Sequence, residues 1–199
     1  MTLKYSAGLV SQFFWLSETR DVIRLKKEGK TEAEIKKICV DENLFGVHSE
    51  SFSLKVCRYI LNRLKCMDDE LMDIFLTSDI STQKIINLFL IVKKDKLFFE
   101  FLFEVYREKY IIGAKSLSKS DLNIFFNNKE LQSEIVANWR EKTKKQLMTM
   151  YINYMTEANL LTDKDGEKLI TPPILDPRLE NYLELNGDVA ILKAIMGVS

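Results

Sequence analysis

The sequence predicts a mainly α-helical, compact protein with helix-turn-helix-like elements and a small C-terminal β-hairpin of winged-helix-like type. Glycine (7 residues) and proline (3) are sparse among its 199 residues, which favours helices over turn-rich β structure. One long helical pattern runs straight into an Asp-Gly pair between short apolar segments. We expect a single unit over residues 1–199, with candidate sub-domains at 1–80 and 81–199 and a winged-helix-like element at 129–175.

Residues 138–175 carry the strongest pattern. On a helical wheel, one face of the first part is apolar and is expected to point inward: Trp139, Thr143, Leu147, Met150, Tyr151, Tyr154, Ala158 and Leu161. The opposite face is polar: Lys142, Lys145, Gln146, Thr149 and Asn153. Asp165-Gly166 predicts a tight hairpin, and Pro172-Pro173 ends its second strand.

A helix that leads into a hairpin is how a winged-helix module presents a helix to a DNA groove. An ordinary core helix followed by a surface hairpin gives the same pattern. The first helical turns contain four cations, Arg140, Lys142, Lys144 and Lys145, where the helix dipole disfavours positive charge. An anionic partner would offset that unfavourable term.

The N-terminal half predicts several short helices. We expect helices at 9–16 and at 19–28, the second ending at Gly29. Thr31 and Glu34 form a capping-box pattern that opens a helix to about residue 44, and a loop then leads to a helix at 52–67.

The helix at 52–67 has one apolar arc and one basic arc. The apolar arc consists of Leu54, Cys57, Ile60, Leu61 and Leu64. Lys55, Arg58, Asn62 and Lys65 line the opposite arc, flanked by Tyr59 and Arg63. Three short helices with a basic outer row on the third match a helix-turn-helix plan. The alternative is a solvated charged face without a partner.

The remaining chain is predicted to be helical apart from its connectors. Acids at the start of a helix at 68–76 match its dipole. Helices at 81–90 and 97–110 are apolar enough to form the buried centre. A polar connector at 115–120, a short helix at 122–126 capped by Ser120-Asp121, a turn at 127–128 and a helix at 129–136 follow. Two closing helices are expected at 178–184 and 189–196.

Charge is balanced overall but segregated along the chain. Lys and Arg number 29, as do Asp and Glu. Residues 47–66 and 139–149 each carry four cations against one acid, whereas 67–81 carry five acids and no cation. A protein of zero net charge can attract a polyanion only through such local clusters.

Enzyme chemistry is not indicated. The sequence has no glycine-rich phosphate loop, no nucleophile elbow and no zinc-protease motif, so we expect no catalytic residue, no cofactor and no small-molecule substrate. Cys39, Cys57 and Cys66 lack zinc-site spacing beside a single histidine, so we expect buried thiols and no metal. No segment predicts a membrane span, and reduced cysteines fit a cytoplasmic location.

Several short motifs, in their order and spacing, resemble the BrxA family of accessory proteins in BREX (bacteriophage exclusion) defence systems. These are Tyr5-Ser6-Ala7-Gly8, Glu28-Gly29-Lys30-Thr31, Arg63-Leu64, Trp139-Arg140-Glu141-Lys142-Thr143, and Glu157-Ala158-Asn159-Leu160-Leu161 through Pro172-Pro173. The resemblance implies an all-helical, non-enzymatic cytoplasmic protein that binds double-stranded DNA. It also implies that the protein acts beside the methyltransferase and the ATPase of such a system in bacterial phage resistance.

The first hypothesis is therefore a double-stranded DNA-binding module. Its candidate contacts are Lys55, Arg58, Asn62, Arg63 and Lys65, with Arg140, Lys142, Lys145 and Gln146 as a second patch. Reversing the charge of Lys55 and Arg58 together is expected to abolish most binding. The alternatives are a protein–protein scaffold within the defence complex and an RNA-binding module.

Overall fold

The computed structural model describes residues 3–197 and is mainly helical, with one small antiparallel sheet near the C-terminus. This confirms the predicted fold class. The chain divides into two compact units. We call Phe14–Ile91 the α3 unit, and the described parts of Met1–Phe13 and Val92–Ser199 the α10 unit.

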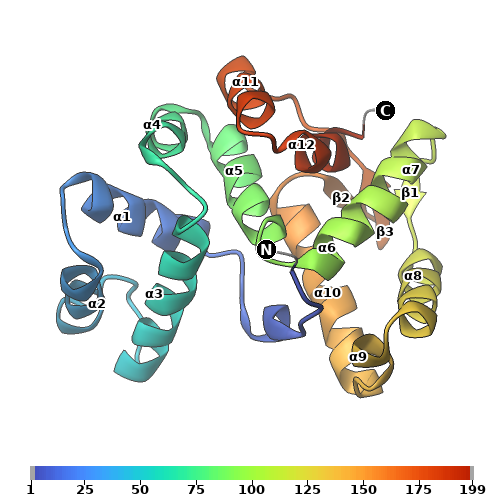
Figure 1. Cartoon of the computed structure of the whole chain (residues 1–199), viewed down its shortest axis with the longest axis horizontal. Coiled ribbons are helices and arrows are strands. Elements are labelled where there is room, and N and C mark those ends of the chain that lie inside the picture. The colour runs from blue at the N-terminus through green and yellow to red at the C-terminus, as the bar shows by residue number, and fades with distance from the viewer. Residues whose placement is uncertain (1–2, 198–199) are drawn as a thin grey trace. The chain divides into compact units, whose positions relative to one another are not determined.

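The α3 unit is a cluster of helices (Figure 1). Its helices are α1 (Leu16–Lys27), α2 (Glu32–Asp41), α3 (Glu50–Leu64), α4 (Asp69–Thr77) and α5 (Ile80–Val92), the last of which crosses the unit boundary. Thr31 and Glu34 form the predicted capping box, in which the Thr31 N–H donates to Glu34 Oε2 at 2.8 Å. Helices α1, α2 and α3 pack on one another, and Val22, Ile35, Cys39 and Cys57 are fully buried among them.

The predicted helix at 9–16 is wrong. The chain makes only a 3-10 turn, η1 (Gly8–Ser11), and α1 starts at Leu16 after Trp15, whose φ is 50°. Hydrogen bonds from other helices of the α3 unit keep Phe14 in a non-helical segment before α1. The carbonyl of Phe14 accepts one hydrogen bond from Asn87 Nδ2 at 2.7 Å and another from Arg63 Nη1 at 3.2 Å.

The α10 unit surrounds an aromatic core. Its helices are α6 (Lys96–Phe101), the π-helical segment η2 (Leu102–Tyr106), α7 (Arg107–Ile111), α8 (Lys119–Gln132), α9 (Glu134–Ala137), α10 (Glu141–Glu157), α11 (Pro177–Leu185) and α12 (Val189–Met196). The ring of Tyr151 stacks on Phe98 with centroids 4.6 Å apart and lies 5.5 Å from Phe101. Tyr154 Oη donates to Gln12 O at 2.7 Å, which fixes the segment after η1 against α10.

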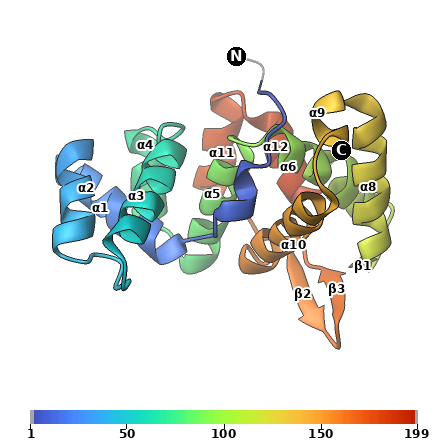
Figure 2. The same cartoon turned by 90° about the horizontal axis from the view of Figure 1, so that it is seen from below.

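Three strands form the sheet of the α10 unit: β1 (Ser116–Leu117), β2 (Leu161–Lys164) and β3 (Glu167–Ile170), in the order β1-β3-β2. The β2–β3 hairpin is the predicted one, with Asp165 and Gly166 at φ 54° and 85°. Figure 2 shows the hairpin projecting beyond the end of α10. β1 lies within the segment predicted to be a polar connector, so that prediction is wrong at Ser116 and Leu117, which pair with β3.

The predicted short helix at 122–126 and turn at 127–128 are also wrong. Ser118, rather than Ser120, caps the helix, and its N–H donates to Asp121 Oδ2 at 2.7 Å. This capping box starts α8 earlier, and the helix then continues through both asparagines to Gln132. The predicted helix at 129–136 is accordingly divided between the end of α8 and the short α9.

Candidate nucleic-acid interface

Helix α10 presents the predicted polar face to solvent. Its inner side is held by Leu147, Tyr151 and Tyr154, each fully buried, while Trp139 precedes the helix and is half-buried. The outer side is exposed at Arg140, Lys142, Lys145, Gln146, Thr149 and Asn153. Arg140 is the residue that immediately precedes the first turn. The helical periodicity therefore places these side chains as expected.

The cations of this segment have different surroundings. Lys144 points inward and is 5% exposed, and its Nζ lies 2.7 Å from Glu130 Oε1 and pairs also with Glu141. The hydrogen bonds that Lys144 donates to Glu130 and to Glu141 raise the pKa of Lys144. Within residues 3–197, neither Lys142 nor Lys145 forms an ion pair with a carboxylate. These two lysines are therefore available to an external anion.

A groove runs between α10 and the 3-10 turn η1. It has a volume of about 530 Å³ and is lined by Val10, Lys142, Lys145, Gln146, Thr149 and Met150. Three of the predicted contact residues, Lys142, Lys145 and Gln146, thus share one concave surface, to which residues 3–197 contribute no carboxylate. Arg140 is exposed nearby in the chain but does not line the groove.

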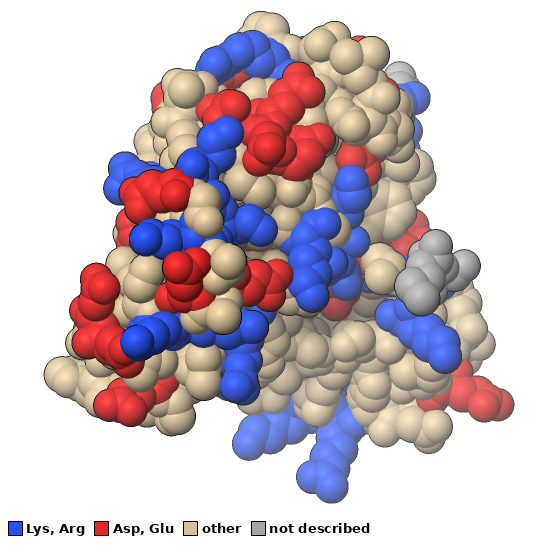
Figure 3. Space-filling model, turned by 60° about the vertical axis from the view of Figure 1, so that its left-hand side comes forward, with Lys and Arg blue, Asp and Glu red and all other residues tan. Residues whose placement is uncertain are grey.

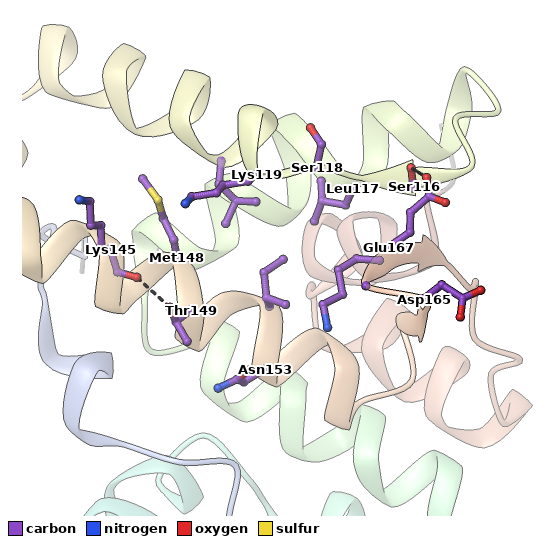
Figure 4. A pocket seen from close by; sticks show the side chains of 14 residues that line it. Ser116, Leu117, Ser118, Lys119, Lys145, Met148, Thr149, Asn153, Asp165 and Glu167 are labelled. Atoms are coloured by element: carbon purple, nitrogen blue, oxygen red, sulfur yellow. Dashed lines mark hydrogen bonds between the residues drawn. The ribbon is translucent and has the colours of Figure 1, made fainter.

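A second, larger groove of about 790 Å³ lies on the hairpin side of α10 (Figure 4). Its lining comes from β1, the start of α8, the outer side of α10 and the hairpin turn: Ser116, Leu117, Ser118, Lys119, Leu122, Lys145, Met148, Thr149, Ile152, Asn153, Asp165, Gly166, Glu167 and Lys168. Lys119 and Lys168 were not among the predicted contacts. No sequence signal identified them, because β1 pairs with β3 across about fifty residues of chain.

The hairpin is held by polar contacts of its own. Lys168 forms an ion pair with Asp163, and this pairing together with the Gly166 N–H lowers the pKa of Asp163. Ser116 Oγ donates to Glu167 Oε1 at 2.8 Å, which links β1 to β3 through side chains as well. Asp165 occupies the tip and is exposed.

The predicted contacts on α3 are only partly at the surface. Lys55, Arg58, Asn62 and Lys65 are exposed, and the Lys55 ammonium lies 5.9 Å from the centre of the Tyr59 ring. Figure 3 shows acidic and basic side chains interspersed over much of the face that it presents. These residues belong to the α3 unit, whereas Lys142, Lys145 and Gln146 belong to the α10 unit.

Arg63 is the predicted contact that the structure contradicts. It is 1% exposed, its Nη1 donates to the carbonyl of Phe14 at 3.2 Å, and its guanidinium lies 5.3 Å from the centre of the Trp15 ring. A buried guanidinium held by a backbone carbonyl and an aromatic face cannot reach a phosphate. Its role is to fix the chain segment before α1.

The three cysteines are free, with Cys39 and Cys57 buried as expected and Cys66 half-buried. Within residues 3–197, no group of three or more His, Cys, Asp or Glu side chains is arranged to hold a metal ion. Over the same residues, no helix combines the length and the apolar character needed to span a bilayer.

Comparison with known proteins identifies the family. Residues 3–187 match the family model for BrxA. The chain is 35% identical over 193 residues to the "BREX protein BrxA" of Bacillus cereus (strain H3081.97), an alignment that covers 97% of this chain and 96% of that protein. The crystal structure of an uncharacterized protein from Magnetospirillum magneticum has the same fold, with a TM-score of 0.81 and 19% identity over 97% of this chain and 98% of that one.

Proposed function

Because the chain belongs to the BrxA family of BREX phage-defence proteins, we propose that it is a non-enzymatic, cytoplasmic accessory protein that binds double-stranded DNA. It would act beside the methyltransferase and ATPase of the system. The family assignment supports the role in defence. The proposal of DNA binding depends on the outer side of α10.

The single observation that carries this proposal is the pair Lys142 and Lys145 on one groove of α10. Both are exposed. Among the described residues, neither has a carboxylate partner and no acid lines the groove that they share. Phosphates of a duplex are the partner that such cations attract, since charge neutralisation dominates protein–DNA affinity. Gln146, which lines the same groove, has the amide group suited to a base edge.

The arrangement of elements around α10 supports the same proposal. A strand (β1), two helices (α8 and the short α9), the exposed helix α10 and a hairpin (β2–β3) follow one another, with β1 beside β3. A winged-helix module likewise presents a helix beside a β-hairpin, and such modules bind with that helix in the major groove. In this reading, α10 is the recognition helix and the hairpin is the wing.

The test is a salt titration of duplex binding, with Lys142→Glu/Lys145→Glu compared with the wild type. We expect wild-type affinity to fall steeply between about 50 and 200 mM salt, with a log–log slope of about −0.9 per phosphate neutralised. The double variant should lose at least about tenfold in affinity and reduce the slope by about 2. Salt-insensitive binding, or full binding by this variant, would contradict the proposal.

Two further variants test whether a loss of DNA binding is specific to the groove on α10. Lys30→Glu/Lys37→Glu changes the net charge by the same amount at exposed positions of the α3 unit outside the proposed contacts, and it should bind nearly as the wild type does. Lys55→Glu/Arg58→Glu measures whether the α3 row adds a second contact. Competition between duplex DNA and duplex RNA separates DNA binding from RNA binding.

A second candidate function, protein docking within the defence complex, is favoured by exposed apolar side chains on the α10 unit. Ile112, Leu131 and Ile174 are 76%, 89% and 91% exposed, and a partner that covered them would remove apolar surface from water. Co-purification from the native operon would then give stoichiometric partners. An electrophoretic mobility-shift assay with duplex DNA of random sequence would show no bound species.

A further inference from the structure

The groove on the hairpin side of α10 is charged with opposite signs at its two ends. Figure 4 shows Lys119 and Lys145 at one end and Asp165 and Glu167 at the other. The lysines come from α8 and α10, Asp165 comes from the hairpin turn, and Glu167 begins β3. The rest of the lining is mixed: Leu117 and Leu122, both 3% exposed, lie in it with the polar Thr149 and Asn153.

The charge at each end remains uncompensated inside the groove. Lys119 and Lys145 form no ion pair among the described residues, so neither is neutralised by the acidic end. Lys168 also lines the groove, but it is paired with Asp163 rather than with Glu167. Glu167 accepts its hydrogen bond from a neutral group, the hydroxyl of Ser116.

We infer that a duplex bound on α10 lies over the lysine end of this groove, that Lys119 is a further phosphate-binding residue, and that Asp165 and Glu167 repel the DNA backbone and limit the site at the hairpin. This inference rests on the proposed function. Its physical basis is that exposed charges act on a phosphate only within about 10 Å at 0.1 M salt. The lysine end of the groove therefore attracts one stretch of the DNA backbone, and the acidic end repels the neighbouring stretch.

Acids placed beside the phosphate-binding lysines explain how a protein of zero net charge could bind DNA without strong attraction to every DNA sequence. Phosphate contacts supply essentially all of non-specific affinity. Carboxylates beside the contact surface lower the non-specific affinity equally for DNA of every sequence. A duplex must then gain affinity through close contacts on α10, where Thr149 and Asn153 face the same groove.

The first test compares Lys119→Glu with Lys115→Glu in duplex binding at low salt. Both lysines are exposed and lie four residues apart, but only Lys119 lines the groove. We expect Lys119→Glu to weaken binding by about tenfold and Lys115→Glu by less than about twofold, on the scale of exposed charge pairs. Equal effects of the two variants would overturn the assignment of Lys119.

The second test removes the acids isosterically with Asp165→Asn/Glu167→Gln, which keeps an acceptor for Ser116 and leaves Asn-Gly, a favoured turn pair. Glu180→Gln/Glu184→Gln on α11 is the matched control, because it removes the same charge at exposed positions away from the groove. We expect the hairpin variant to bind about threefold more tightly than the control, with the difference vanishing at about 0.5 M salt.

The outcomes separate this inference from the proposed function. If the wild type binds no duplex, both fail. If the wild type binds and Lys142→Glu/Lys145→Glu does not, the proposed function stands. In that case, a hairpin variant that binds no better than its control overturns the inference. A hairpin variant that binds less tightly overturns it too, since the carboxylates would then be accepting contacts from DNA.

Discussion

Helices α3 and α10 each carry a cation-rich segment, yet the two helices place their cations differently. On α10, Lys142 and Lys145 are exposed beside a groove that contains no acid from the described part of the chain, whereas Lys144 turns inward to Glu130. On α3, Arg63 is buried against Phe14 and Trp15. The remaining cations of α3 line none of the grooves described above.

The difference shows that a local excess of Lys and Arg has two physical causes. A cation can lie in the interior, where it contacts a carbonyl, a carboxylate or an aromatic ring, or it can be exposed at the surface. Only the second kind contributes to a binding surface. The exposed cations of α10 are therefore better placed to bind DNA than the cations of α3 are.

Arg63→Ala should give the largest loss of stability, about 3 to 4 kcal/mol in the free energy of unfolding. The variant removes a buried side chain, its hydrogen bond to Phe14 and its contact with the Trp15 ring. Arg58→Ala on the same helix should change stability by less than about 0.5 kcal/mol. Urea denaturation of both variants checks this, and equal effects would contradict the interior role of Arg63.

Asp95 provides a pH-dependent test on the inner side of the α10 unit. It is 5% exposed and caps α6, and burial raises its pKa from 3.8 to about 6. Because the folded protein then binds a proton more tightly than the unfolded chain, stability should fall as pH rises from about 4 to 6 and level off above. The expected change is about 3 kcal/mol.

Asp95→Asn is the control for that pH dependence. Asparagine keeps an acceptor for the N–H of Phe98, now 2.8 Å from Asp95 Oδ1, but it does not titrate. The fall in stability between pH 4 and 6 should therefore shrink by the same amount in thermal or urea unfolding. An unchanged pH profile in this variant would show that other groups cause the dependence.

Lys144→Ala should lower stability by about 2 kcal/mol without weakening duplex binding. The substitution leaves Glu130 without its cation and removes the buried part of the side chain. Lys145→Ala, one residue along, should do the opposite: little change in unfolding and a measurable loss of DNA affinity. If Lys144→Ala binds DNA as weakly as Lys145→Ala does, the division of this segment into inward and outward cations is wrong.

The smallest expected effect compares the two capping boxes, one in each unit. Thr31→Ala and Ser118→Ala each remove the acceptor for a backbone N–H, from Glu34 and Asp121 respectively. Each should lower stability by about 1 kcal/mol. If the two units unfold independently, each variant should shift one of two transitions in calorimetry. A single transition that both variants shift would show that the units unfold together.

Features that arise from neighbouring residues could be predicted before the fold was known. The Thr31–Glu34 capping box, the Asp165-Gly166 hairpin and the inward and outward faces of α10 were all predicted, because caps, tight turns and helical periodicity act over a few residues. The outward positions of Lys142, Lys145 and Gln146 follow from that periodicity alone.

Contacts between groups that are distant in the chain could not be predicted in this way. The pairing of β1 with β3, the groove that brings Lys119 close to α10, and the burial of Arg63 each depend on residues about fifty or more positions apart or in different elements. The physical reason is that a backbone carbonyl such as that of Phe14 leaves no trace in the pattern of side chains. It nevertheless draws a guanidinium into the core once the fold brings the two together.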